Sequence, residues 1–129
     1  MADIHTIQEG RELDALVAEK VMGITLVADP WDDHDYCYRE DGELLSVAPY
    51  STSIAAAWQV VEKLKNGSPV GVGFSTRISY WPADTGEEWI VSFGCNTYPD
   101  KGNRIVEATA STAPLAICRA ALCVVTEER

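Results

Sequence analysis

The sequence predicts an α+β fold in which an antiparallel β-sheet is sandwiched between α-helices (helix–sheet–helix). Three segments repeat apolar residues with the period of a helix. Between the second and third of these segments lie consecutive strand-like segments separated by turn residues, which indicates an antiparallel meander rather than a doubly wound parallel sheet. A length of 129 residues with 47 % hydrophobic and 23 % charged residues fits a single globular domain, 1–129.

The first predicted helix covers about residues 11–22. Leu13, Leu16, Val17 and Val21 recur at steps of three and four residues, with polar side chains between them. Gly23 ends the segment, because glycine readily leaves the helical conformation. This helix is therefore expected to cover one face of the sheet.

The segment that follows contains an acidic loop and a short hairpin. Residues 24–28 are a short apolar stretch, and residues 29–35 are rich in aspartate. Strands are predicted over 36–40 and 44–47, joined by Asp41-Gly42, since both of these residues tolerate positive φ.

The second helix is predicted from about residue 54 to Leu64. The hydroxyls of residues 50–53 can cap its first turn, and Asn66-Gly67 ends it. Its apolar residues form one stripe at helical spacing: Ile54, Ala57, Trp58, Val61 and Leu64. The stripe predicts that Trp58 is a core side chain.

Strand-like patterns then occupy residues 70–75, 77–81, 89–95 and 105–110, with turn chemistry at 84–86 and 100–102. Both faces of the third of these strands carry apolar or small residues, so the sheet is expected to be covered, at least in part, on both sides.

The last helix is predicted over residues 112–126. Thr112 can cap it and Pro114 suits its first turn. Its apolar face is broad and exceeds what one packing surface needs, which predicts a further contact with another subunit. The residues of this face are Leu115, Ile117, Cys118, Ala121, Leu122, Val124 and Val125.

The charge excludes several classes of partner. Twenty acidic and ten basic residues give a net charge of −10, which opposes attraction to duplex nucleic acid or an anionic membrane. A pocket that concentrates a few arginines could still bind an anionic small molecule. No apolar run approaches the length of a membrane span and no signal peptide is present, so a cytosolic protein with free thiols is expected.

No catalytic or cofactor motif is recognisable. A calcium loop counted from Asp33 would need a glycine and a glutamate where the chain has Tyr38 and Leu44. His34 and Cys37 could form a nucleophile–base pair, but no third group to orient the base is identifiable. The cysteines lack zinc-site spacing, and phosphate-binding glycine loops are missing. A protein without enzymatic activity, cofactor or metal is expected.

The remaining polar and aromatic residues suit a nucleotide ligand without requiring one. Aromatic faces can stack on a base, guanidinium groups can grip phosphate and amides can read a base edge. The candidates are Trp31, Trp81, Trp89 and Phe93 for stacking, Arg39, Arg77, Arg104 and Arg119 for phosphate, and Asn96 and Asn103 for the base edge.

Three ordered segments carry a resemblance to a known family. Residues 50–64, YSTSIAAAWQVVEKL, resemble a helix of the phage ABA-sandwich domain family, and residues 11–23 and 112–122 resemble its opening and closing helices. The likeness covers residues 11–123. One departure is Ser53, where members often carry an acidic residue, which affects only the helix cap.

The resemblance implies a function in phage anti-defence. Members of this kind include the Thoeris anti-defence protein 1 family, which implies a sponge that binds cyclic nucleotide immune signals without degrading them. The implied ligands are glycocyclic ADP-ribose of Thoeris systems and cyclic trinucleotides of CBASS systems, at separate sites. A homo-oligomer, with hexamers built from dimers, in the cytoplasm of the infected bacterial host is also implied.

The family's glycocyclic ADP-ribose pocket uses an aromatic residue, an asparagine and arginines. Phe93, Asn103 and Arg39 are the nearest candidates by type and approximate position, with Phe93 and Asn103 on the base and ribose and Arg39 near the phosphates. The pocket residues of the family could instead correspond to Trp81, Asn96 or Arg104 in this chain, and Arg119 is a further candidate. The alternatives are a small nucleotide-hydrolysing enzyme that uses the acidic loop, and a protein–protein adaptor that uses exposed tryptophans.

Overall fold

The computed structural model describes residues 7–29, 32–66, 74–82, 84, 86, 88–98 and 102–126. The element order is α1 (Arg11–Lys20), β1 (Val27–Asp29), β2 (Asp32–Glu40), β3 (Glu43–Ser46), α2 (Ile54–Lys65), β4 (Ser75–Tyr80), β5 (Trp89–Tyr98), β6 (Gly102–Ala110) and α3 (Ala113–Thr126). The predicted class is confirmed: helices pack with antiparallel strands in one small α+β domain.

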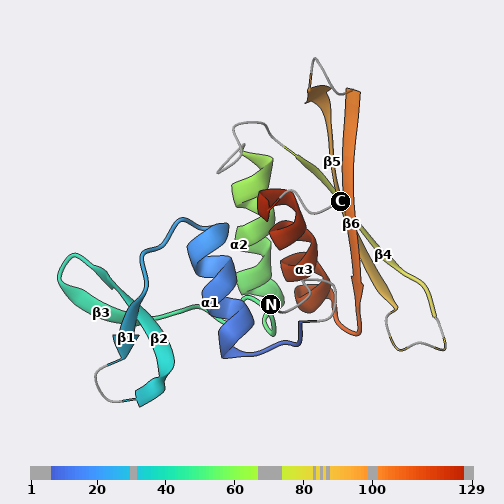
Figure 1. Cartoon of the computed structure of the whole chain (residues 1–129). Helices are drawn as coiled ribbons and strands as arrows, with labels where there is room; N and C mark the ends of the chain where they lie inside the picture. The colour runs from blue at the N-terminus through green and yellow to red at the C-terminus, as the bar shows by residue number, and fades with distance from the viewer. Residues whose placement is uncertain are drawn as a thin grey trace.

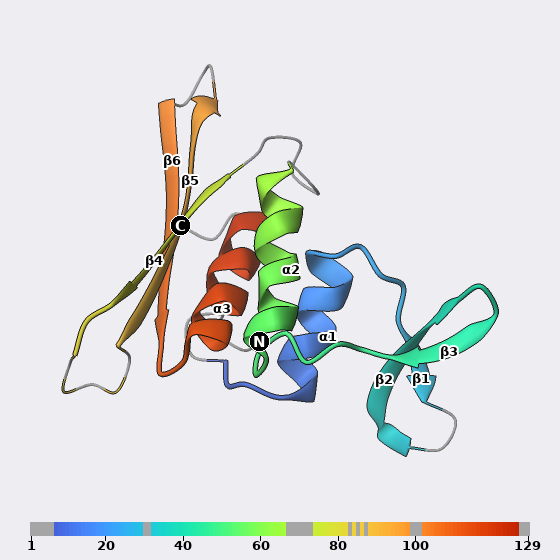
Figure 2. The same cartoon turned by 180° about the vertical axis from the view of Figure 1, so that it is seen from behind.

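Within the described residues, the strands form two three-stranded antiparallel sheets, β1–β2–β3 and β4–β5–β6. The helices form a layer between them, and β4–β5–β6 lies on the side of α3 while β1–β2–β3 lies beyond α1 (Figures 1 and 2). The order of the layers therefore differs from the predicted helix–sheet–helix order, because the strands divide into two sheets on either side of the helices. The segments predicted as strands over 70–75 and 77–81 are one strand, β4, because the chain runs straight through Thr76; residues 70–73 lie outside the described part.

The first hairpin follows the prediction from turn chemistry. Arg39 pairs with Leu44 and Glu40 with Glu43 across the turn, and Asp41 and Gly42 have φ values of 53° and 85°. Positive φ at two consecutive positions matches the right-handed twist of the two strands that it joins.

Helix α2 starts where the hydroxyl cap was predicted, but it faces the core differently. The Ser53 hydroxyl accepts a hydrogen bond from the Ala56 N–H at 3.3 Å. Ile54 and Trp58 are 52 % and 48 % exposed, so the prediction that they are core residues is wrong. The buried stripe is Ala56, Ala57, Val60, Val61 and Leu64. This stripe of α2 is the buried one because α2 packs closely on α3, and small alanine side chains permit that close approach.

Helix α3 is the centre of the fold. It packs against β5, β6, α2 and α1, and all ten residues from Leu115 to Val124 are buried. Its broad apolar face is therefore covered by its own chain. This corrects the inference that the width of the face requires another subunit.

Cys37, Cys118 and Cys123 are buried thiols outside any disulfide. In the part of the chain that the structure describes, no group of three His, Cys, Asp or Glu residues could hold a metal ion. None of the described helices is long and apolar enough to cross a membrane.

Candidate functional site

The three residues expected to share a ligand do not come together. Phe93 lies on β5 and Arg39 on β2, in different sheets on opposite sides of the helical layer (Figure 2). Phe93 pairs with Thr76 and Val106 and is 0 % exposed. It points into the core between sheet and helices, so its assignment to a ligand site is corrected to a packing role.

The other candidates on the second sheet divide into two groups. Trp81 follows β4 and is 67 % exposed. Asn103 and Arg104 lie on β6, where Arg104 pairs with Cys95, but their side chains lie outside the described residues, as does that of Asn96 on β5. None of these positions lies near the sheet that carries Arg39.

Arg119 has a structural role. Its side chain is buried, with the residue 3 % exposed. Its Nε donates to the Ile7 carbonyl at 3.0 Å and its Nη1 donates to the Thr109 carbonyl at 2.8 Å. The guanidinium therefore ties the segment before α1 to the end of β6, and the assignment of Arg119 to a ligand is corrected as well.

Arg39 lines a cavity of about 440 Å³ between the α1–β1 connection, β2 and α2. Its described lining residues are Met22, Ile24, Thr25, Tyr38, Arg39, Tyr50 and Gln59. None of them is acidic, although the chain carries a net charge of −10. They supply one guanidinium, two phenol rings, an amide and a hydroxyl beside apolar side chains.

Tyr50 is the most buried of the polar groups in this lining. The residue is 3 % exposed, and burial raises the pKa of its hydroxyl, with smaller contributions from Tyr38, Asp14 and Cys118. Its hydroxyl therefore keeps its proton throughout the neutral range and can donate a hydrogen bond. Among the described residues no hydrogen bond reaches this hydroxyl, so it is available to a polar atom inside the cavity.

A buried network beside Tyr50 fixes its backbone. The Asp14 carboxylate accepts hydrogen bonds from the Ser51 N–H at 2.8 Å and from the Ser51 hydroxyl at 2.6 Å. The Gly10 N–H donates to the same hydroxyl at 3.0 Å. Because Asp14 and Ser51 are both buried, these bonds hold the chain before α2 firmly against α1.

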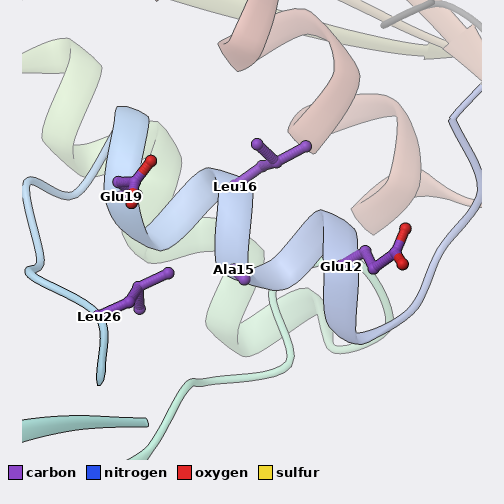
Figure 3. A pocket seen from close by; sticks show the side chains of 5 residues that line it. All are labelled: Glu12, Ala15, Leu16, Glu19 and Leu26. Atoms are coloured by element: carbon purple, nitrogen blue, oxygen red, sulfur yellow. The ribbon is translucent and has the colours of Figure 1, made fainter. Parts of the chain in front are cut away.

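Two further cavities have different chemistry. One of about 320 Å³ lies along α1 and is lined by Glu12, Ala15, Leu16, Glu19 and Leu26, so its two carboxylates disfavour an anion (Figure 3). The other, of about 530 Å³, lies between α2 and the start of β4 and is lined by Trp58, Val61, Glu62, Lys65, Phe74, Ser75 and Thr76. The positive charge of Lys65 and the negative charge of Glu62 offset each other in this cavity.

Arg39 was a candidate from the sequence, whereas the residues that line the cavity beside it were not. Tyr38, Tyr50 and Gln59 come from three separate segments, and only the packing of β2 against the helices brings them together. The pairing of an arginine with a neighbouring tyrosine at 38–39 was the one local signal that could have indicated this place.

Comparison with known proteins gives a consistent family assignment. The chain is similar to a phage protein from Bacillus cereus ATCC 14579, whose crystal structure was determined at 2.0 Å. The two share 26 % sequence identity with a TM-score of 0.67, over 98 % of this chain and 93 % of the other. No curated protein matches. The model of the phage ABA sandwich domain matches residues 15–122, and the chain therefore belongs to this family.

Proposed function

We propose that this phage ABA sandwich domain binds a cyclic nucleotide signal of bacterial immunity and sequesters it without chemical change. The observation that carries the proposal is the cavity at Arg39, whose described lining offers a cation, aromatic rings and neutral polar groups in a strongly acidic protein. An anionic ligand would meet less repulsion there than at the cavity of α1, which two glutamates line.

Four side chains of the lining match the chemical groups of a nucleotide. The Arg39 guanidinium can bind a phosphate through two parallel hydrogen bonds. The rings of Tyr38 and Tyr50 can contact a base, and the Gln59 amide can bind base or ribose edges. A volume of about 440 Å³ lies within the usual range of small-molecule sites.

The same lining supports sequestration over hydrolysis. General acid–base catalysis of phosphate ester cleavage needs a carboxylate, a histidine or a metal-bound water close to the reacting bond. The described lining holds no carboxylate, histidine or cysteine, and the raised pKa of the Tyr50 hydroxyl keeps it protonated, so that it cannot accept a proton as a base. We therefore propose that the protein holds the bound nucleotide without hydrolysing it.

The proposed ligands are glycocyclic ADP-ribose and cyclic trinucleotides, the two signal classes implied by the resemblance to anti-defence sponges. The likeness to a phage protein supports action inside an infected bacterium. Assembly into a homo-oligomer remains a prediction, since the structure describes one chain.

Isothermal titration of each signal tests the proposal. We expect saturable binding of one of them. Arg39→Ala and Tyr50→Phe should each weaken this binding by about tenfold, because each substitution removes a protein group that forms a hydrogen bond with the ligand. Lys65→Ala is the matched control: it also removes a positive charge, from an exposed position at the end of α2. Unchanged binding by Arg39→Ala would place the ligand elsewhere, and an equal loss in Lys65→Ala would indicate a general charge effect.

A further inference from the structure

The β1–β2–β3 sheet projects from the rest of the molecule. It lies beyond α1, and the turn between β2 and β3 extends away from the helices (Figures 1 and 2). Among the principal contacts between elements, this sheet meets the helices only where β2 touches α1, whereas β4, β5 and β6 all pack against α2 or α3. We term residues 27–46, which form the three strands and their turns, the arm.

The arm buries little apolar surface of its own. Leu44 and Leu45 on β3 point to opposite faces, because neighbours on a strand alternate, and both are partly exposed. Among the described side chains of the arm only Cys37 is buried, and it does not belong to the core cluster of the domain. A small sheet of this kind depends on packing against other elements for its stability. The arm is therefore held in place by its contacts with the helices.

Tyr38 is the described residue of the arm that packs against the core cluster. The chain is also anchored on both sides of the arm, since Leu26 before β1 packs on the core and Val47 after β3 is buried in it. The arm is thus fixed at its two ends and held along its length by one tyrosine side chain. This is the arrangement of a hinged segment with a latch.

The cavity at Arg39 lies at the joint between the arm and the helices. Tyr38 and Arg39 line it from the arm, while Tyr50 and Gln59 line it from the helical side. Tyr38 lies close enough to Tyr50 to contribute to the raised pKa of the Tyr50 hydroxyl. A molecule in the cavity therefore touches both sides of the joint, and its contacts with the arm add to those of the latch.

We propose that the arm is a clasp, which opens about its anchored ends while the helices and β4–β5–β6 stay folded, and which closes on the molecule in the cavity at Arg39. Segments with few buried apolar contacts open at a lower free-energy cost than the core. Opening admits a ligand, and closing excludes water and slows the ligand's escape, as sequestration requires. The inference rests on the proposed function for the identity of the ligand but not for the opening itself.

Amide hydrogen exchange of the ligand-free protein tests the opening. We expect the paired amides of β2 and β3 to exchange at least about 100-fold faster than those of residues 116–124 in α3, because the arm opens without global unfolding. Tyr38→Ala should speed exchange in the arm by about a further tenfold and leave α3 unchanged, since it removes the latch. Tyr80→Ala is the matched control: it removes an exposed tyrosine from β4 in the other sheet and should leave the arm unchanged.

Three results of this comparison would overturn the inference. Equal exchange rates in the arm and in α3 of the wild type would show that the arm unfolds only together with the core. A loss of protection in α3 of Tyr38→Ala as large as the loss in the arm would show the same. An effect of Tyr80→Ala on the arm equal to that of Tyr38→Ala would remove the latch.

The same measurement with ligand tests the closing. Glycocyclic ADP-ribose and a cyclic trinucleotide are the probes, and titration first gives the Kd of each. At a ligand concentration of 100 Kd, a probe that binds only the closed arm should slow exchange in β2 and β3 by about 100-fold. Unchanged exchange in the arm with a bound probe would overturn the clasp and leave the proposed function standing. Failure of both probes to bind would overturn the proposed function and the closing with it, while the ligand-free rates would still decide the opening.

Discussion

Replacement of Arg119 tests whether this buried cation is structural or binds a ligand. Arg119→Met keeps much of the aliphatic volume and removes the guanidinium. The Ile7 and Thr109 carbonyls then lose their donors at 3.0 and 2.8 Å. A part-buried carbonyl left without a partner costs about 1–2 kcal/mol, so the substitution should lower the free energy of unfolding by about 2–4 kcal/mol. Arg119→Ala should cost more, because packing is lost as well.

Thermal and urea unfolding measure this effect. For a domain of this length about 1 kcal/mol shifts Tm by about 4 °C, so Arg119→Met should melt about 8–16 °C below the wild type. Arg39→Ala is the control at an exposed arginine and should change the free energy of unfolding by less than about 0.5 kcal/mol. An unchanged Tm in Arg119→Met, together with lost ligand affinity, would refute the structural assignment.

Other substitutions test the core, the buried network and the pH dependence. Phe93→Ala should lower the free energy of unfolding by about 3–5 kcal/mol, because the side chain is fully buried; a change below about 1 kcal/mol in urea unfolding would contradict this. Asp14→Ala and Ser51→Ala should each cost about 2–3 kcal/mol, and the double variant should cost less than their sum, since both remove the same hydrogen bonds. Additive losses in this double-mutant cycle would show that the pair is not coupled. Burial raises the pKa of the Cys118 thiol above its ordinary value of 9.0, with a smaller contribution from Asp14. The unfolded thiol therefore releases its proton first, and stability should fall as pH rises above about 9, by up to about 1.4 kcal/mol per pH unit for this group. Cys118→Ala should have a shallower pH dependence by one proton, and an identical slope would contradict the assignment.

Much of the local structure follows from the sequence. The periodic segments before Gly23 and after Thr112 form α1 and α3, and the hydroxyl at Ser53 caps α2. The Asp41-Gly42 turn joins β2 and β3. These features depend on interactions between residues that are close in the sequence, such as caps, turn conformations and helical spacing. They can therefore be predicted from a single sequence.

The orientation of α2 shows where local patterns become ambiguous. Two overlapping stripes share Ala57, Val61 and Leu64, and both have helical spacing. The stripe with Ile54 and Trp58 is more hydrophobic, but the structure buries the alternative. The choice depends on how closely α2 can approach α3, which is a property of two helices and not of one.

The division of the strands into two sheets was not predictable for the same reason. Pairing of β1 with β2 and of β5 with β6 is local, but nothing in the sequence shows that the helical layer separates the two groups. As a result, Phe93 and Arg39 were expected to share a site that their positions in different sheets do not allow. The cavity at Arg39 depends on the same long-range packing.

The most direct test of sequestration is recovery of the ligand after binding. The protein is saturated with glycocyclic ADP-ribose or a cyclic trinucleotide, freed of unbound ligand, denatured by heat and analysed by mass spectrometry of the released small molecule. We expect intact ligand in a fixed ratio to the protein, and much less ligand with Arg39→Ala, because this variant lacks the guanidinium that lines the cavity. Release of a cleaved product, or retention of equal amounts by wild type and Arg39→Ala, would contradict it.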